Sequence, residues 1–306
     1  MKNGKKDDGI IVLRRTEPDM CGGTDATLDT KAPKSIVSDE MVLFDVTSAL
    51  YQTGSDPKTE PLRFVSAFAA RTANGTFVFL KKSRYNGCRG KSEMSWALVK
   101  SDIFPELVKL VRGHDLAKDN GFHSETHGLP ENFGGSADIR YASGECISFS
   151  NNQRPVISSE AGTETARIFA KALKAKKVPL PDPSELKAVK YEENRSKGGF
   201  TKATLTLNAD GTAVNAKQSR YDDGYVYETE KPVSKETVDK LKEVIRNTGI
   251  FAWSDLPSRN YSFLGNKKLI FVFEDGKEIT VKNDRVLPYH ISDGFFAFEL
   301  EMTTKH

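Results

Sequence analysis

The 306-residue chain has few cysteines, no long apolar run and no excess of charge of one sign. The spacing of its three cysteines matches neither a disulfide framework nor a zinc pair, so we expect a reducing compartment, the cytoplasm. No window approaches the roughly 18 consecutive apolar residues that a membrane-spanning helix needs. With 45 basic and 42 acidic residues, the net charge of +3 gives no general attraction to nucleic acid. We therefore expect a folded protein without a transmembrane segment and without a nucleic-acid partner.

The first 34 residues contain little that could form a core. They hold scattered charges, several glycines and one short apolar run, Ile10 to Leu13. We expect an extended or poorly ordered N-terminal arm, unless this run adds an edge strand to a sheet. A polar stretch precedes Cys21, so a cell-surface or lipid-anchored location is expected only if a leader has been removed.

Two long segments of the chain are similar to each other. Residues Phe64 to Tyr85 match residues Phe200 to Tyr221 at a spacing of 136, and further matches follow in the same order at spacings of 134 and 132. Because chance matches would not keep this order, we expect a duplication. Prolines 179, 181 and 183 predict an extended linker between the copies. The expected parts are an N-terminal arm (1–34), a first α+β repeat (35–175), a linker (176–183) and a second α+β repeat (184–306).

Each copy has the pattern of a mostly antiparallel sheet with attached helices. Alternating apolar and polar residues predict strands, and Asn-Gly or Asp-Gly pairs predict hairpin turns. The predicted strands include 41–50, 62–72, 92–98 and 224–230. We expect an α+β fold of two tandem repeats, each with a hairpin, further strands, a helix, a second hairpin and a final helix.

A helical period follows the strands in both copies. Leu107 and Leu241 lie at matching positions of the two apolar stripes, which we expect to face the sheets. The expected helix starts are Ser101 and Ser234, and the expected ends are Gly113 and Gly249. The second hairpins are expected to turn at 143–144 and 275–276, and the final helices lie near 159–173 and 292–303.

Short motifs in both copies resemble those of uncharacterised bacterial proteins, found in gut Firmicutes, with tandem α+β domains. The motifs are Arg84-Tyr-Asn-Gly87, Asn120-Gly-Phe122, Tyr221-Asp-Asp-Gly224, Ile250-Phe-Ala-Trp253 and Phe273-Glu-Asp-Gly276. In the first copy, Asp119 stands at the position of the tryptophan. The resemblance implies an α+β fold and assigns no function.

Two histidines with a carboxylate between them are the clearest candidate for metal chemistry. His123 and His127 lie four residues apart, and on a helix both rings would face one side and could hold zinc with a third ligand. The candidates for that ligand are His114, Glu131 and Cys146. Because glycines and a proline surround the segment, we expect a loop and no cofactor, with zinc as the alternative.

The tripeptide Ser-Arg-Tyr occurs in both copies and suggests a ligand site. Arg84 and Tyr85 in the first copy match Arg220 and Tyr221 in the second. A buried tyrosine ring and an arginine ion pair would explain these residues structurally, whereas a cleft between similar domains could use all four to bind a ligand. We expect a non-catalytic module that binds a protein, a peptide or a small molecule. A metal-dependent hydrolase using the His123/His127 segment is the alternative.

Overall fold

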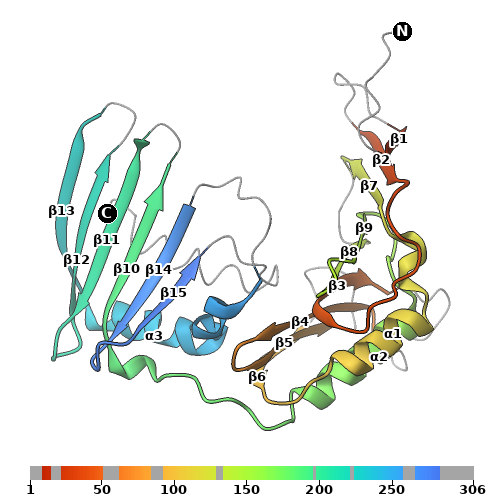
Figure 1. Cartoon of the computed structure of the whole chain (residues 1–306). Coiled ribbons are helices and arrows are strands. Elements are labelled where there is room, and N and C mark those ends of the chain that lie inside the picture. The colour runs from red at the N-terminus through yellow and green to blue at the C-terminus, as the bar shows by residue number, and fades with distance from the viewer. Residues whose placement is uncertain are drawn as a thin grey trace. The chain divides into compact units, whose positions relative to one another are not determined.

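The computed structural model describes residues 9–14, 22–50, 62–83, 92–128, 134–195, 198–220, 224–257 and 266–282. The described chain is an α+β protein, rich in strands, with two sheets (Figure 1). It divides into two compact units, Met1–Val178 and Pro179–His306, with the boundary inside the proline-rich segment 176–183. None of the described helices is long and apolar enough to cross a membrane.

The first unit contains a nine-stranded sheet in the order β1-β2-β7-β9-β8-β3-β4-β5-β6. Its strands are β1 (Ile10–Arg14), β2 (Gly23–Asp29), β3 (Met41–Ala49), β4 (Phe64–Thr72), β5 (Gly75–Ser83), β6 (Ser92–Val99), β7 (Phe122–His127), β8 (Gly135–Tyr141) and β9 (Cys146–Asn151). Neighbouring strands are antiparallel except for β7 and β9, which are parallel. The strands and hairpins expected at β3 to β6 and at β8 and β9 are confirmed.

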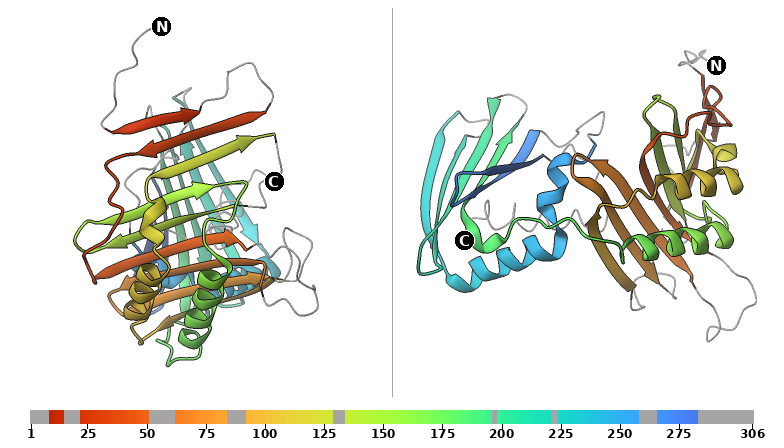
Figure 2. Two further views of the ribbon diagram at one scale, coloured as in Figure 1. Left: turned by 90° about the vertical axis from the view of Figure 1, so that its right-hand side faces the viewer. Right: turned by 60° about the horizontal axis from the view of Figure 1, so that its bottom comes forward.

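Two α-helices of this unit, α1 (Phe104–Gly113) and α2 (Ser159–Ala172), lie side by side against one face of the sheet (Figure 2). A 3₁₀ helix, η1 (Leu116–Asp119), follows α1. The N-cap of α2 is Ser158, whose Oγ accepts a 3.1 Å hydrogen bond from the amide of Ala161. The expected start of α1 at Ser101 is wrong, because the carboxylate of Asp102 accepts the amide of Phe104 at 3.0 Å instead.

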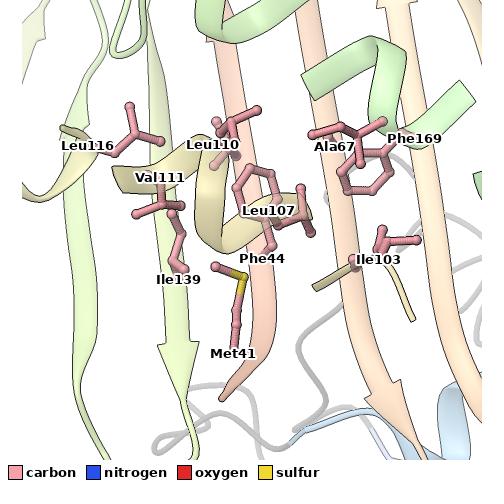
Figure 3. Close-up of a cluster of buried hydrophobic side chains, with 14 of the residues drawn as sticks. Met41, Phe44, Ala67, Ile103, Leu107, Leu110, Val111, Leu116, Ile139 and Phe169 are labelled. Atoms are coloured by element: carbon pink, nitrogen blue, oxygen red, sulfur yellow. The ribbon is translucent and has the colours of Figure 1, made fainter. Parts of the chain in front are cut away.

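The core of the first unit lies between these helices and the sheet (Figure 3). Leu107 of α1 is fully buried, as the apolar stripe predicts, and packs in one cluster with residues of β3, β4 and β8. The rings of Phe44 and Phe169 lie 5.9 Å apart and join β3 to α2. Burial of this cluster supplies the main favourable free energy for this layer.

The second unit contains a six-stranded antiparallel sheet in the order β13-β12-β11-β10-β14-β15. Its strands are β10 (Leu186–Asn194), β11 (Phe200–Leu207), β12 (Ala213–Arg220), β13 (Val226–Val233), β14 (Asn266–Phe273) and β15 (Glu278–Lys282). Its helices are η2 (Pro183–Glu185), α3 (Lys235–Thr248) and η4 (Ile250–Asp255). Buried rings of Phe251 and Phe271, 5.0 Å apart, join η4 to the sheet.

Helix α3 begins and ends as its sequence predicts. The Oγ of Ser234 accepts a hydrogen bond from the amide of Thr237, and Gly249 takes a left-handed conformation with φ of 64°. Leu241 is buried on its apolar stripe. The expected final helix at 292–303 lies outside the described residues.

The N-terminal segment differs from the expectation of an arm. Strand β2 pairs with β7 along its whole length, and β1 pairs with β2, so 10–14 and 23–29 extend the nine-stranded sheet. Ile10 to Leu13 therefore add an edge strand, which was the stated alternative to an arm. The expectation of an arm is wrong for β2, which lies between two other strands of the sheet. No apolar alternation marks Gly23–Asp29, so its strand is set by pairing with β7 rather than by its own pattern.

Candidate functional site

The two candidate histidines lie on a strand, β7, and not on the expected loop. Pairing with β2 on one side and β9 on the other holds this segment extended, despite the glycines around it. Four positions along a strand correspond to about 13 Å, so His123 and His127 share a face but stand too far apart to grip one ion. The spacing that would suit zinc on a helix does not suit it here.

Each histidine is bonded to a different partner. The Nδ1 of His123 lies 2.9 Å from Oγ of Ser150 on β9, and burial lowers the pKa of this half-buried ring. The Nε2 of His127 lies 3.1 Å from a carboxylate oxygen of Asp25 on β2. These contacts link β7 to both of its neighbours.

The proposed third ligands are not gathered around these rings. His114, at the end of α1, pairs with Glu164 of α2 at 2.9 Å. Cys146 begins β9 and is exposed, and Glu131 lies outside the described residues. Within the described ranges, no group of three or more His, Cys, Asp or Glu side chains is placed to hold a metal ion.

The pair of His123 and Ser150 has the distance of a catalytic base and its nucleophile. A nucleophile also needs an orienting group for the base and an accessible cleft. Ser150 instead sits inside the ladder between β8 and β9, opposite Ser136. We therefore interpret this contact as a link between strands.

The Ser-Arg-Tyr motifs are out of register by one residue between the two units. Phe64 pairs with Ser83, whereas its counterpart Phe200 pairs with Arg220 rather than with Ser219. The cause is the turn between β11 and β12, which is one residue longer than the turn between β4 and β5. The side chain of Asp210 stabilises this turn by accepting bonds from the amide and hydroxyl of Thr212, and these bonds lower its pKa.

Arg220 is exposed at the end of β12, while Arg84, Tyr85 and Tyr221 lie outside the described residues. In the ladder, Arg220 stands opposite Val226, the first residue of β13. Of the four residues expected to bind a ligand, Arg220 can thus be placed, and it lies beside an edge strand.

Strand β13 forms one edge of the six-stranded sheet and carries an exposed aromatic cluster at its start. Tyr225, Val226 and Tyr227 are 71%, 51% and 47% exposed. In the part of the chain that the structure describes, β12 is the one strand paired with β13. The sequence predicts this strand, at 224–230, but the exposed Tyr-Val-Tyr triplet within it was not recognised as a candidate site, although it was a usable signal.

A shallow groove of about 480 Å³ lies over β11, β12 and β13, next to this edge. Its charged lining residues are Lys202, Lys217, Glu228 and Glu230. Glu228 accepts a 2.8 Å hydrogen bond from the side-chain Nε2 of Gln218, and Glu230 lies two residues further along the same face. The groove therefore has an acidic side at the strand edge and basic residues further in.

The C-terminal end of the outer edge of β6, in the first unit, is occupied by the chain itself. The amide of Val178 donates to the carbonyl of Leu98 at 2.7 Å, and the amide of Lys100 donates to the carbonyl of Lys176 at 3.1 Å. Lys177 forms an antiparallel bridge with Val99. An extended segment of three residues thus covers the part of this sheet edge at 98–100.

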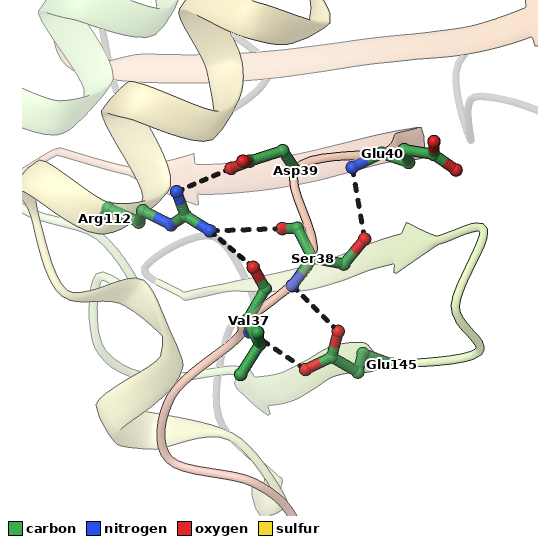
Figure 4. A network of polar contacts seen from close by, with 6 residues as sticks. All are labelled: Val37, Ser38, Asp39, Glu40, Arg112 and Glu145. Atoms are coloured by element: carbon green, nitrogen blue, oxygen red, sulfur yellow. Dashed lines mark hydrogen bonds and ion pairs between the residues drawn. The ribbon is translucent and has the colours of Figure 1, made fainter.

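A second polar cluster, around Arg112, ties the segment before β3 to the fold (Figure 4). The guanidinium of Arg112 lies 2.6 Å from Asp39 and donates to the carbonyls of Val37 and Ser38. The carboxylate of Glu145 accepts the amides of Val37 and Ser38, and the bond from Val37 is the main cause of its lowered pKa. All of these groups are satisfied within the cluster, which gives it a structural role.

The chain was compared with models of known protein families and with curated proteins, and neither comparison finds a match.

Proposed function

We propose that the protein is a non-catalytic binding module of two duplicated α+β units, and that it binds an extended peptide along the outer edge of β13. The observation that carries this proposal is the edge of β13, which pairs with β12 alone among the described strands and is bordered by the exposed Tyr225, Val226 and Tyr227 and by the acidic side of the groove. An exposed strand edge presents unpaired amides and carbonyls that can pair with an added strand.

The duplication is supported by the order of the strands. Six strands of the first sheet follow β9-β8-β3-β4-β5-β6, and the second sheet follows β15-β14-β10-β11-β12-β13. The strand that comes first in each proposed copy, β3 or β10, stands third in its order, and the other five strands stand at matching places. In both units, a helix and a 3₁₀ helix follow the four-stranded meander and precede the second hairpin, with the additional strand β7 before the hairpin of the first unit.

Irregular details of the strand pairing recur in the two units as well. Two unrelated domains share such irregularities less often than they share an order of strands. A β-bulge interrupts the pairing of β3 with β8 between Met41 and Leu43, and a bulge interrupts β10 with β14 between Leu186 and Ala188. The second hairpins close with the same bond. In the first unit the amide of Tyr141 donates to the carbonyl of Glu145, and in the second the amide of Phe273 donates to the carbonyl of Lys277.

A further recurring detail is an arginine at the end of the first helix. Arg112 pairs with Asp39, and Arg246, which lies 134 residues later, pairs with Asp182 at 3.6 Å. In each unit the aspartate belongs to the segment that leads into the first strand. The duplicated arginines are thus accounted for by folding and need no ligand.

The first unit supplies a precedent for peptide binding at this edge. Under the proposed duplication, β6 corresponds to β13, and the β6 edge already holds the extended segment Lys176 to Val178. The same edge of the second unit would accept a strand in the same way, with backbone hydrogen bonds providing affinity.

The charges beside β13 indicate which peptide fits. A strand added to this edge would place alternate side chains next to Glu228 and Glu230, where lysine or arginine is favoured. The opposite face would meet Tyr227 and Thr229, which suit apolar or aromatic side chains. We expect a ligand in which basic residues alternate with apolar ones.

The test uses a labelled synthetic peptide with the sequence of residues 172–181, which contains the segment that pairs with β6. Fluorescence anisotropy with the full chain should show saturable binding. Substitution of both Glu228→Lys and Glu230→Lys should weaken binding about threefold to tenfold, the size expected for exposed charge pairs. The matched control, Glu278→Lys on the opposite edge strand β15, should leave binding unchanged.

Two further measurements decide between pairing along the edge and charge attraction alone. A peptide methylated on alternate backbone nitrogens keeps its charges and should lose its binding, because it cannot form the ladder. Equal binding of the methylated peptide, or equal binding by the double lysine variant, would overturn the proposal. So would the absence of binding by the unmodified peptide up to about 1 mM.

A further inference from the structure

We propose that the peptide bound at β13 runs antiparallel to this strand, with its basic residues on the N-terminal side of its apolar residues. The proposal rests on the peptide site at β13 and adds the direction of the ligand and the order of its residues. The direction follows from the segment that covers part of β6, and the order follows from the uneven distribution of side chains along β13.

The segment that covers part of the β6 edge runs antiparallel to that strand. Lys177 forms an antiparallel bridge with Val99, and the amide of Val178 donates to the carbonyl of Leu98. The backbone groups of Leu98 therefore point away from β5 and toward the added segment. Antiparallel pairing is also slightly more stable per residue than parallel pairing. We expect the same direction at β13, which is the corresponding edge of the second unit under the proposed duplication.

Alternate residues of β13 turn their backbone groups toward the outer edge, and Pro232 is one of them. The amide of Asn208 donates to the carbonyl of Thr212 at the turn between β11 and β12. Because bonding alternates along an antiparallel ladder, Val214 bonds toward β11, and its β13 neighbour Pro232 faces outward. The other outward-facing residues of the strand are Val226, Glu228 and Glu230. Since proline has no amide proton, a complete ladder on the outer edge is limited to positions 226–230.

The side chains at these outward-facing positions change from apolar to acidic along the strand. Val226, at the start, is 51% exposed and lies between two exposed tyrosines. Glu228 and Glu230 follow it on the same face. Arg220 of β12 stands opposite Val226 in the ladder, so the start of the strand disfavours a further cation, whereas the two glutamates favour one.

The direction and this distribution together define the order of residues in the ligand. An antiparallel strand reaches the two glutamates with its N-terminal half and the start of β13 with its C-terminal half. Basic residues should therefore come first and apolar residues second. In the peptide of residues 172–181, Lys174 and Lys176 would face the two glutamates. Val178 would then face Val226.

A peptide that contains residues 172–181 in reverse order tests the order. With both ends blocked, it has the same composition and charge as the original peptide, so attraction between charges alone would hold the two equally. In fluorescence anisotropy with the full chain, the original peptide should bind at least about threefold more tightly, because the reversed peptide keeps its side-chain contacts only in a parallel ladder. Equal binding, or tighter binding of the reversed peptide, would overturn the proposal.

Disulfide trapping tests the direction of the bound strand. Serine first replaces the three native cysteines, Cys21, Cys88 and Cys146. The protein then carries Tyr227→Cys or Lys231→Cys, and the peptide carries Leu173→Cys or Lys177→Cys. Facing residues that share no backbone bonds bring their Cβ atoms close enough for a disulfide. Circular dichroism confirms that each protein variant is folded.

The two directions predict opposite pairs of cysteines. An antiparallel peptide brings position 173 beside 231 and position 177 beside 227, and these pairs should form disulfides. The exchanged pairs are then about 13 Å apart and should react at least about tenfold more slowly. A preference for the exchanged pairs would overturn the antiparallel direction while leaving the peptide site in place. Absence of binding by the unmodified peptide would remove the site itself, and the proposal with it.

Discussion

Six strands of the first sheet have the same order as the six strands of the second, but the two sheets differ in the face that does not carry the helical core. In the first unit this face is apolar and buried. Its fully buried residues include Leu43, Phe68, Phe77 and Phe79, and none of them belongs to the cluster beneath α1 and α2. In the second unit the face that alternates with the buried residues of β10 and β11 is charged. Its residues include Lys190, Glu192 and Lys202.

This difference can be read in the strands themselves. Strand β4 is nearly continuous in apolar and small residues and has a run of buried positions, as strands covered on both faces do. Strand β11 alternates between buried and more exposed positions, which is typical of a sheet with one solvated face. One arrangement of strands thus serves both as a layer buried on two sides and as a solvated surface.

The solvated face gains little stability from its charges. Lys268 of β14 lies 2.8 Å from Glu192 of the neighbouring strand β10, and Lys190 of β10 lies 3.3 Å from Glu278 of β15, two strands away. Exposed pairs of this kind are worth at most about 1 kcal/mol each. We infer that the second sheet depends on its single apolar face, whereas the first depends on two.

The largest expected effect comes from truncating the buried outer face of the first sheet. Phe79 pairs with Phe68, and at the corresponding place in the second unit Ala216 pairs with Thr204. Phe79→Ala should lower the free energy of unfolding by about 3–5 kcal/mol, because it removes a fully buried ring and leaves a cavity. Ala216→Ser, on the solvated face, should change it by less than about 0.5 kcal/mol.

Each unit holds one of the two tryptophans, so unfolding can be followed separately in each. Trp96 reports on the first unit in a Trp253→Phe background, and Trp253 reports on the second in a Trp96→Phe background. Denaturant unfolding of Phe79→Ala with a loss below about 1 kcal/mol would contradict the two-sided burial of β5.

The second expected effect concerns the helical core that both units share. Leu107→Ala and Leu241→Ala should each cost about 2–5 kcal/mol, from lost transfer free energy and a residual cavity. The cost should be greater for Leu107, which is fully buried in a larger cluster, than for Leu241, which is 7% exposed. Denaturant midpoints followed by the two tryptophans measure the loss of stability in each variant. Unchanged midpoints in both variants would show that these stripes face solvent.

Much of the fold could be predicted because local signals and tertiary packing agree in it. The capped ends of α3, the hairpin at Asp275-Gly276 and the apolar stripes of Leu107 and Leu241 all follow from short sequence patterns. Strands β2 and β7 could not be predicted, since their polar residues carry no period and their extended form depends on each other. The change of register before Arg220 comes from one additional residue in the turn. The sequence gives no sign of it, because the Ser-Arg-Tyr motifs lie at the same distance from Phe64 and Phe200.

The candidate site was less predictable than the fold for a related reason. The residues expected to bind a ligand belong to motifs that occur in both units, but residues at matching sequence positions, such as Arg112 and Arg246, are explained by folding contacts. Among the described residues, part of the β6 edge is covered by segment 176–178 whereas the outer edge of β13 has no strand paired to it, and no single-residue pattern records that difference.

A smaller effect is expected at a matched turn after the first helix of each unit. Asp115 has a left-handed φ of 49°, and Gly249, 134 residues later, has a φ of 64°. Asp115→Gly should raise the free energy of unfolding by up to about 1 kcal/mol, and Gly249→Ala should lower it by about 1 kcal/mol, because a side chain is strained in this conformation. Opposite signs in thermal unfolding would support the correspondence, while a loss in both variants would contradict it.

The smallest expected effect is a pH dependence in the first unit. Burial lowers the pKa of His123, so the folded state binds its proton less readily than the unfolded state, where the pKa is about 6.5. The unfolded state therefore gains the proton first as the pH falls, and the free energy of unfolding should decrease from about pH 7 to about pH 5.5. In His123→Gln this slope should be smaller when followed by Trp96, whereas Ser150→Ala, which keeps the histidine, should retain it. Identical slopes in the wild type and His123→Gln would show that this ring does not couple protonation to folding.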